Sequence, residues 1–277
     1  CFTNLGKVYW LKVYQITVAG RNSRGRPVVN LLPLDEGERI SSILPVEDYS
    51  ADKFVIMATA NGTVKKTSLD QYSRPRSVGL RAVDLADGDH LVGTAIIDGS
   101  KDIMLFSSEG KAVRFSETDV RAMGRVSTGV RGMRLPEEHK VISMVVPEED
   151  GFLLTVCENG YGKRTKVTEF PTKGRGGKGM IAIQASDRNG PLVGATQLFS
   201  GDEIMLISDQ GTMVRTRGDE VSVVGRNTQG VRIIRLKDSE NLVSLARIAE
   251  PEEELPLEDA LAGEIADDAT PADGSEE

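Results

Sequence analysis

The chain has 277 residues, a net charge of −8 and two cysteines, Cys1 and Cys157. Two cysteines exclude a disulfide framework and fit no metal-ligand spacing, and no apolar run reaches the 18 residues that a membrane helix needs. We therefore expect a cytoplasmic protein with no metal, no cofactor and no membrane partner. Residues 250–277 hold 12 Asp and Glu but no Lys or Arg, so the other residues carry 34 basic against 30 acidic side chains, about +4. This asymmetry favours a polyanion partner for the body, and the simpler alternative is a solubilising tail on an ordinary globular body.

Five turn glycines divide the chain from its start into repeats. An apolar strand is predicted before each glycine and an alternating strand after it, as in Ile103–Phe106 and Lys111–Phe115 around the third. Asn61-Gly62 and Asn159-Gly160 predict hairpins, because both residues tolerate the positive φ of a type I′ turn. The five turn glycines are Gly6, Gly62, Gly110, Gly160 and Gly211, and the spacings between them are 56, 48, 50 and 51 residues.

Each repeat continues through a glycine-containing basic loop into a third strand, such as Gly129–Leu135, and then through a polar turn into a fourth. Four strands per roughly 50 residues predict an all-β, propeller-like ring of blades. Tryptophan-aspartate repeats do not fit, because Trp10 is the only tryptophan, and aromatic residues are too few for kelch repeats. The predicted domain is 1–249, with repeats near 1–50, 51–99, 100–149, 150–201 and 202–249, followed by an acidic tail, 250–277. Its composition predicts disorder.

The basic loops form a second column, which ends at Gly25, Gly79, Gly129, Gly179 and Gly230. An arginine lies four residues before each glycine except in the second repeat, where arginines flank Pro75. Cations repeated along a curved surface can meet phosphates without reading bases. The candidate residues for contact with phosphates are Arg21, Arg24, Arg26, Arg74, Arg76, Arg81, Arg125, Lys173, Arg175, Lys178 and Arg226.

The loop of the fourth repeat is the strongest of these, with the sequence Lys173-Gly174-Arg175-Gly176-Gly177-Lys178-Gly179. It matches the G-x-G-x-x-G dinucleotide pattern, but a strand, Met180–Ile183, is predicted after it where that pattern requires a helix. It also fails the phosphate-loop pattern, because Lys178 is followed by glycine. We interpret it as a loop that binds a phosphate backbone.

A third column lies four residues after each turn glycine: Trp10, Lys66, Arg114, Arg164 and Arg215. These residues fall on predicted strands, so we expect ion pairs between blades from them and no DNA contacts. His90 and His139 are isolated near turns and are expected at the surface, and Cys157 is expected in a buried strand. No catalytic set of residues is visible, so the chain alone is not predicted to be an enzyme.

Several strings resemble the C-terminal domain of bacterial DNA gyrase A: Asn61–Thr67, Glu158–Thr165, Thr128–Leu135 and Val224–Val231. The resemblance covers nearly the whole chain and implies a β-pinwheel, a six-bladed, propeller-like disc whose basic rim wraps double-stranded DNA. It implies partners in the rest of gyrase A and in gyrase B, a chromosome-associated location in bacteria, and active sites outside this chain.

Two departures from that family are expected to matter. Only five turn glycines occur, so the chain resembles a fragment without the first blade, and closure of its ring is open. The family's Gln-Arg-Arg-Gly-Gly-Arg/Lys-Gly box belongs to that blade, and Lys173–Gly179 matches it at five of seven positions. Three alternatives stay open: the related domain of topoisomerase IV, which lacks the box, a protein- or glycan-binding propeller, and a propeller enzyme. The acidic tail is expected to dock on the basic rim as an internal competitor.

Overall fold

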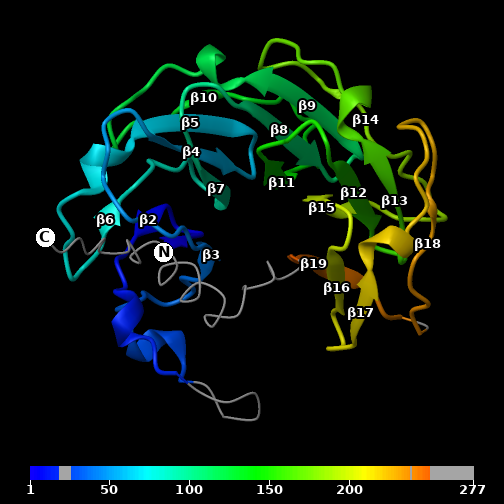
Figure 1. The fold of residues 1–277 in the computed structure, drawn as a ribbon, viewed down its shortest axis with the longest axis horizontal. Helices are drawn as coiled ribbons and strands as arrows, with labels where there is room; N and C mark the ends of the chain where they lie inside the picture. The colour runs from blue at the N-terminus through cyan, green and yellow to red at the C-terminus, as the bar shows by residue number, and fades with distance from the viewer. Residues whose placement is uncertain (19–25, 238, 250–277) are drawn as a thin grey trace, which may run out of the picture.

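The computed structural model describes residues 1–18, 26–237 and 239–249. They form five antiparallel sheets arranged around a common centre as the blades of a propeller-like, all-β structure (Figure 1). This confirms the predicted fold class. The helical segments of the described residues are single 3-10 turns: η1 (Val13–Gln15), η2 (Val28–Asn30), η3 (Leu69–Tyr72), η4 (Glu117–Asp119), η5 (Val167–Glu169) and η6 (Gly218–Glu220). The tail, whose disorder the sequence predicts, lies outside the described residues.

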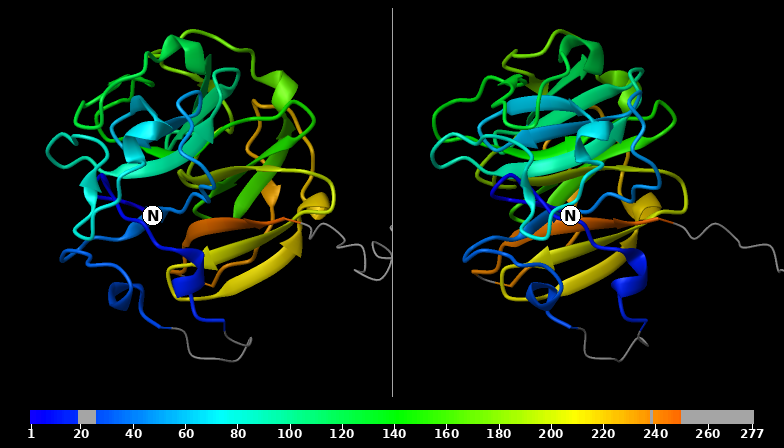
Figure 2. Two further views of the ribbon diagram at one scale, coloured as in Figure 1. Left: turned by 60° about the vertical axis from the view of Figure 1, so that its left-hand side comes forward. Right: turned by 90° about the vertical axis from the view of Figure 1, so that its left-hand side faces the viewer.

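One strand closes each blade on the inner side, beside a hairpin of two strands; it has five to seven residues in every blade except the first, where it has three. Neighbouring sheets face one another around the centre, as two further views show (Figure 2). The inner strands are β3 (Ile40–Ser42), β7 (Leu91–Ile97), β11 (Val141–Val145), β15 (Leu192–Leu198) and β19 (Leu242–Ile248). The hairpins are β1 (Phe2–Thr3) with β2 (Lys7–Val8), β4 (Phe54–Thr59) with β5 (Thr63–Ser68), β8 (Asp102–Ser107) with β9 (Lys111–Ser116), β12 (Phe152–Cys157) with β13 (Tyr161–Lys166), and β16 (Glu203–Ser208) with β17 (Met213–Arg217).

The outer strand of each complete blade comes from the following repeat. One repeat therefore does not supply all four strands of its own blade. The strand after each basic loop crosses back and pairs with the preceding hairpin, as Val130 does with Val64. These outer strands are β6 (Leu80–Arg81), β10 (Val130–Arg131), β14 (Met180–Ile181) and β18 (Val231–Arg232). The exchange ties consecutive blades together by main-chain hydrogen bonds as well as by packing.

The two ends of the series depart from this rule. The last described sheet has three strands, β17-β16-β19, and no outer strand from the described residues joins it. In the first repeat the segment after the basic loop pairs with none of the described hairpins. It forms η2, so the third strand predicted there is wrong. Among the described residues no strand is shared between the first and last sheets, so strand pairing there does not join these two sheets.

The hydrophobic core lies between blades, and this placement explains the continuous apolar strands of the sequence. On β8, Ile103 and Leu105 pack towards the second blade, whereas Met104 and Phe106 pack towards the fourth. A strand buried on both faces cannot alternate between apolar and polar residues. In the last blade one face of β16 is only half buried, and no further blade of the described residues covers it.

Candidate nucleic-acid interface

The basic loops of the second to fifth repeats lie at the outer edge of the blades. Each runs from a 3-10 turn to an outer strand and ends at a glycine with positive φ, for example +111° at Gly129 and +77° at Gly230. A Cβ at Gly129 would stand 2.5 Å from the Val64 carbonyl oxygen, closer than any side chain allows. Only glycine therefore lets the loop cross over the hairpin of the preceding blade. The loop of the first repeat lies largely outside the described residues.

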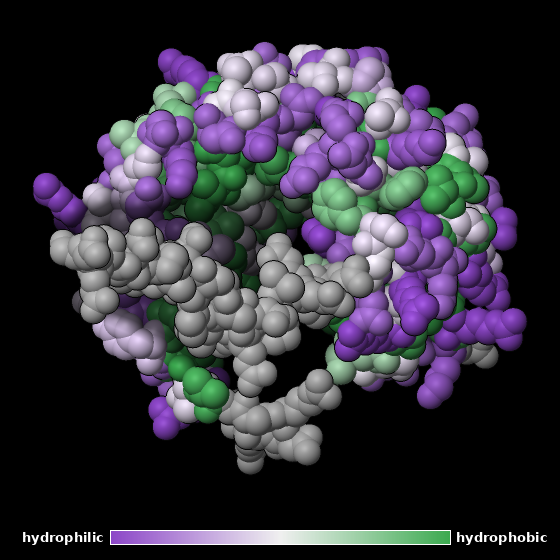
Figure 3. All heavy atoms as spheres, viewed as in Figure 1, coloured by the Kyte–Doolittle hydropathy of each residue, from purple (hydrophilic) through white to green (hydrophobic). Residues whose placement is uncertain are grey.

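The described candidate cations are at least partly accessible to solvent on this edge. Of the eleven predicted residues, Arg21 and Arg24 lie outside the described residues, and Arg125 and Arg226 are half buried. The others are exposed: Arg26, Arg74, Arg76, Arg81, Lys173, Arg175 and Lys178. Hydrophilic residues occupy much of the upper and right-hand outer edge in the space-filling view (Figure 3). The fold therefore brings most of the loops that were predicted from sequence to one curved edge.

Two of the column arginines also hold neighbouring loops together. Arg175 donates from Nη1 to the carbonyl oxygen of Arg131 at 3.0 Å and from Nε to that of Asp119 at 2.9 Å. Arg226 donates from Nη1 to the carbonyl oxygen of Ile181 at 3.0 Å. Both Nη1 acceptors lie on outer strands that follow the basic loop of the preceding repeat: Arg131 is in β10 and Ile181 is in β14. A guanidinium carries five N–H donors, so each arginine keeps donors for a ligand.

The loop Lys173–Gly179 spans two blades. The Lys173 amide donates to the carbonyl oxygen of Arg114 in the third blade at 2.8 Å, and the Gly176 amide donates to that of Gly132, beside the second blade, at 2.6 Å. Gly176 has φ +78°, which glycine alone adopts without strain. The ammonium groups of Lys173 and Lys178 make no ion pair within the described residues. The loop thus has a fixed backbone and two free charges.

Further cations that the sequence reasoning missed lie on or after the outer strands. Arg131 and Arg232 are exposed two residues after a loop glycine, as is Arg81. This shared repeat position was the signal that could have identified them. Arg134 lies near Lys111 and Lys178 in a pocket of about 300 Å³, which Glu109 also lines. An anion would meet three cations and one carboxylate there.

Tyr161 stands between two arginines in the fourth blade. The guanidinium carbons of Arg188 and Arg232 lie 4.8 and 5.1 Å from its ring centre. Arg232 also donates to the Tyr161 hydroxyl at 2.6 Å. Hydrogen bonds from Arg188 and Arg232 lower the pKa of this tyrosine. The ring holds both guanidinium groups in place at the surface.

The third column of basic residues forms structural ion pairs, as expected. Lys66 binds Glu117 of the next blade at 2.8 Å, and both side chains are buried. Arg164 binds Asp219 of the next blade at 2.7 Å. Arg114 pairs with Asp102 and Glu149, and Arg215 pairs with Glu203, but Asp102 and Glu203 lie in the same blade as their arginines. These charges are neutralised by carboxylates and are not available to a polyanion.

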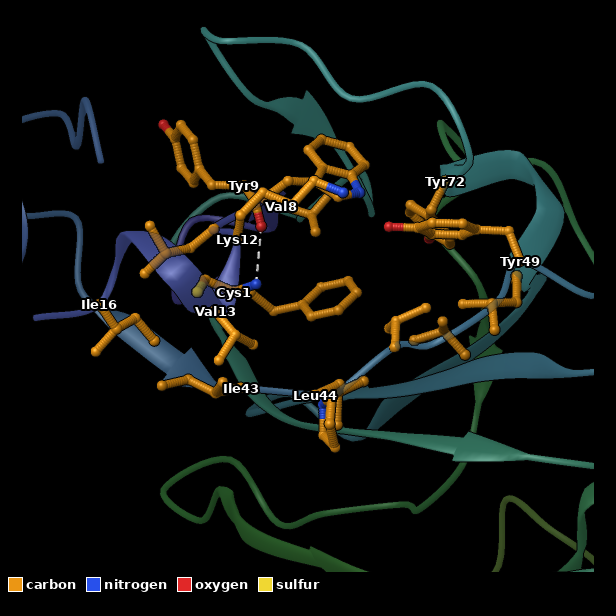
Figure 4. A pocket seen from close by; sticks show the side chains of 17 residues that line it. Cys1, Val8, Tyr9, Lys12, Val13, Ile16, Ile43, Leu44, Tyr49 and Tyr72 are labelled. Atoms are coloured by element: carbon orange, nitrogen blue, oxygen red, sulfur yellow. Dashed lines mark hydrogen bonds between the residues drawn. The ribbon is translucent and has the colours of Figure 1, made fainter. Parts of the chain in front are cut away.

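An apolar cavity of about 310 Å³ lies between the first and second blades (Figure 4). Phe2, Val8, Leu44, Tyr49 and Tyr72 are among the residues that line it. No group of three or more potential metal ligands occurs within the described parts of the chain. None of the helices there is long and apolar enough to cross a membrane. Among the described residues, the charged side chains able to bind a ligand are therefore concentrated at the cationic outer edge.

Comparison with known proteins agrees with this arrangement. The family model of the DNA gyrase C-terminal domain, a β-propeller, matches residues 1–47, 53–98, 101–148, 151–197 and 202–249. The DNA gyrase A protein of Salmonella typhimurium is 55% identical over 267 residues, covering 96% of this chain and 30% of that protein. The Escherichia coli protein is 54% identical over 273 residues, covering 98% and 31%. The chain thus spans about a third of the length of these relatives.

Solved structures give the same result. A DNA gyrase A C-terminal domain superposes with a TM-score of 0.77 at 27% identity, covering 90% of this chain and 81% of that one. The C-terminal domain of a DNA topoisomerase IV superposes with a TM-score of 0.84 at 24% identity, covering 95% and 82%, and this likeness concerns the fold alone. The family match extends over most of the chain and over all five blades. The chain therefore belongs to the DNA gyrase C-terminal domain family.

Proposed function

We propose that this domain binds double-stranded DNA along its cationic outer edge and bends the duplex around it. The observation that carries the proposal is the repetition of the basic loop at the outer edge of successive blades. The exposed charges belong to the basic loops, whereas Lys66, Arg114 and Arg164 between the sheets are already paired with carboxylates. An interface of this kind suits phosphates, which recur along DNA whatever its sequence.

The energetics of bending require several loops to act together. Bending a site of 20–30 base pairs by 40–90° costs on the order of 1–6 kcal/mol. No single exposed arginine offsets that cost, so the duplex has to engage several blades at once. Loss of one cation is then expected to weaken binding modestly, and loss of several to abolish it.

Within a longer protein the domain would act at a distance from the chemistry. The relatives are DNA gyrase A proteins, so we propose that the domain works with the rest of gyrase A and with gyrase B. Its role would be to wrap the duplex so that the holoenzyme introduces negative supercoils. We assign no catalytic residue, metal or cofactor to this chain, and we propose a bacterial cytoplasmic location on the chromosome.

Residues 250–277 are proposed to compete with DNA. Their 12 carboxylates face a body of about +4, so docking of this segment on the basic rim would screen the loops. Removal of the segment should tighten DNA binding, and the gain should shrink as salt screens both interactions. If truncation leaves affinity unchanged at every salt concentration, the segment has no competing role.

The first test is binding of a linear duplex over a salt series. Six to ten phosphate contacts predict a loss of about 10³–10⁵ in affinity between 50 and 200 mM salt. The variant Lys173→Gln/Lys178→Gln removes two charges without removing a structural contact, so the salt slope should fall by about 1.8. Lys53→Gln is the control, because this partly exposed lysine lies outside the loops and is paired with Asp48. A flat salt dependence would refute DNA binding and favour a protein-binding propeller.

A second test separates wrapping from binding. Relaxed plasmid incubated with the domain and a nicking-closing topoisomerase should retain supercoils after deproteinisation if the duplex is wrapped. Binding without any change of linking number would favour the alternative behaviour expected of the topoisomerase IV domain. The handedness of the trapped supercoils gives the direction of the wrap.

A further inference from the structure

Two fully buried lysines occupy the same position in alternate repeats. Lys65 on β5 and Lys163 on β13 each follow a turn glycine by three residues, and their exposed fractions are 1% and 0%. The other repeats have Tyr9, Val113 and Val214 at this position. Neither lysine forms an ion pair within the described residues. A buried ammonium is costly unless its donors are satisfied, so two such residues in place of valine need a physical reason.

Lys163 binds the basic loop of the fifth repeat from beneath. Its Nζ donates to the carbonyl oxygens of Gly225 at 2.7 Å and Arg226 at 2.5 Å, and to Oγ1 of Thr228 at 3.2 Å. An ammonium has three donors, and this loop supplies three acceptors. All of the acceptors lie between η6 and β18, the segment that carries the column arginine Arg226. The side chain therefore fixes the loop to the preceding blade.

Lys65 makes the corresponding contact in the second blade. Its Nζ donates to the carbonyl oxygen of Ala82 at 2.6 Å and to that of Arg125, the column arginine of the third repeat. In the third blade Val113 takes the place of the lysine. The loop Lys173–Gly179 is held there by the guanidinium of Arg175, which donates to carbonyl oxygens of the neighbouring strand and turn. Buried lysines thus anchor the loops of Arg125 and Arg226 through the carbonyl groups of those arginines.

We propose that Lys65 and Lys163 are positioning residues for DNA binding, which fix the backbone of Arg125 and Arg226 so that the two guanidinium groups face the duplex. This inference rests on the proposed function of the outer edge. A loop held at the arginine carbonyl loses its freedom before DNA arrives, so binding costs less conformational entropy. The buried charge also adds to the positive potential of the edge.

The protonated state of the lysines is part of this arrangement. Burial lowers the pKa of both Lys65 and Lys163 to about 8, so each is still predominantly charged at neutral pH. Arg125 and Asp84 act on the charge of Lys65, with opposite signs. Glu169, Arg226 and the thiol of Cys157 act on that of Lys163. A neutral amine has only two donors, so deprotonation would leave one acceptor of Lys163 unpaired.

The variant Lys163→Met tests the inference, because methionine keeps the length of the side chain but removes the three donors. Val113→Met is the matched control at the same position of the third blade. Without DNA, trypsin should cleave after Arg226 faster in Lys163→Met than in the parent protein, and cleavage after Arg175 should stay unchanged. With DNA, the salt slope should fall by about 0.9, the value of one phosphate contact.

A double-mutant cycle with Arg226→Ala separates positioning from general stability. If Lys163 acts through Arg226, Lys163→Met should cost no further affinity when Arg226 is already absent. Additive losses of DNA affinity, or an unchanged rate of cleavage after Arg226, would overturn the inference. The proposed function would still stand in that case, provided that the parent protein binds DNA. Absence of DNA binding by the parent protein would overturn both. Should Lys163→Met fail to fold, Thr228→Val removes one acceptor from the loop itself and should produce the same changes to a smaller extent.

Discussion

The buried pair of Lys66 and Glu117 offers the sharpest test of how the blades are held together. One Glu117 oxygen accepts a hydrogen bond from the Lys66 ammonium at 2.8 Å. The other accepts hydrogen bonds from the backbone amides of Gly99 at 2.9 Å and Lys101 at 2.8 Å. The Glu117 side chain is 0% exposed and that of Lys66 is 8% exposed. The ammonium also faces the ring of Phe54, at 4.4 Å from its centre. Removal of the carboxylate therefore leaves a buried charge without a counterion.

Breaking a buried pair by removing one partner costs about 3–5 kcal/mol, which is the loss we expect for Glu117→Ala. Glu117→Gln should cost less, because the amide oxygen can still accept the two backbone N–H groups. Lys66→Met/Glu117→Gln should recover part of the loss, since an apolar side chain needs no counterion. Guanidinium unfolding followed by circular dichroism gives these differences from the transition midpoints, provided that the m-value is unchanged.

Glu203→Gln is the control for this series, because its partner Arg215 is 57% exposed in the last blade. A surface pair contributes about 0–1 kcal/mol, so this change should be nearly silent. If Glu117→Ala costs no more than Glu203→Gln, the ion pairs between blades do not stabilise the ring. The cohesion of the blades would then rest on apolar packing and strand exchange alone.

Three further outcomes are expected. Gly110→Ala should be less stable than Gly211→Ala by at least about 1 kcal/mol. Both glycines have φ near +82°, but only at Gly110 would the added Cβ meet a neighbouring carbonyl oxygen, at 2.4 Å. Equal unfolding midpoints for the two variants would contradict close packing of the exchanged strand. Because the pKa of Lys65 and of Lys163 is about 8, below that of an unfolded lysine, the unfolded state binds more protons between pH 8 and 10.5. The free energy of unfolding should therefore rise with pH in this window relative to a Lys65→Met/Lys163→Met variant, and a constant difference would argue against the lowered pKa. Burial raises the pKa of the Cys157 thiol to about 12, so it should resist a thiol reagent at pH 8 until the protein is unfolded, and rapid labelling of the native protein would show that β12 opens.

Local chemistry was sufficient to predict much of this molecule from its sequence. Turn glycines such as Gly62 predicted the hairpins, because a positive φ is needed wherever two strands reverse tightly, and the structure has φ +83° there. The apolar runs predicted the buried strands, and the column of Lys66 and Arg164 was correctly interpreted as structural. The basic loops were also found, since charges at a fixed place in a repeat are visible without any knowledge of contacts.

Tertiary structure alone decided which blade each strand joins and what each buried charge touches. The strand at Val130 has the same local sequence pattern whether it pairs with its own repeat or with Val64 of the preceding one, so the exchange is invisible in sequence. Lys163 likewise looks like an exposed lysine on an alternating strand. Only the packing of the next repeat over the hairpin buries it and brings the carbonyl oxygen of Arg226 within reach. Sequence determined the elements through short-range conformational preference, whereas the pairing of distant segments set the environment of each charge.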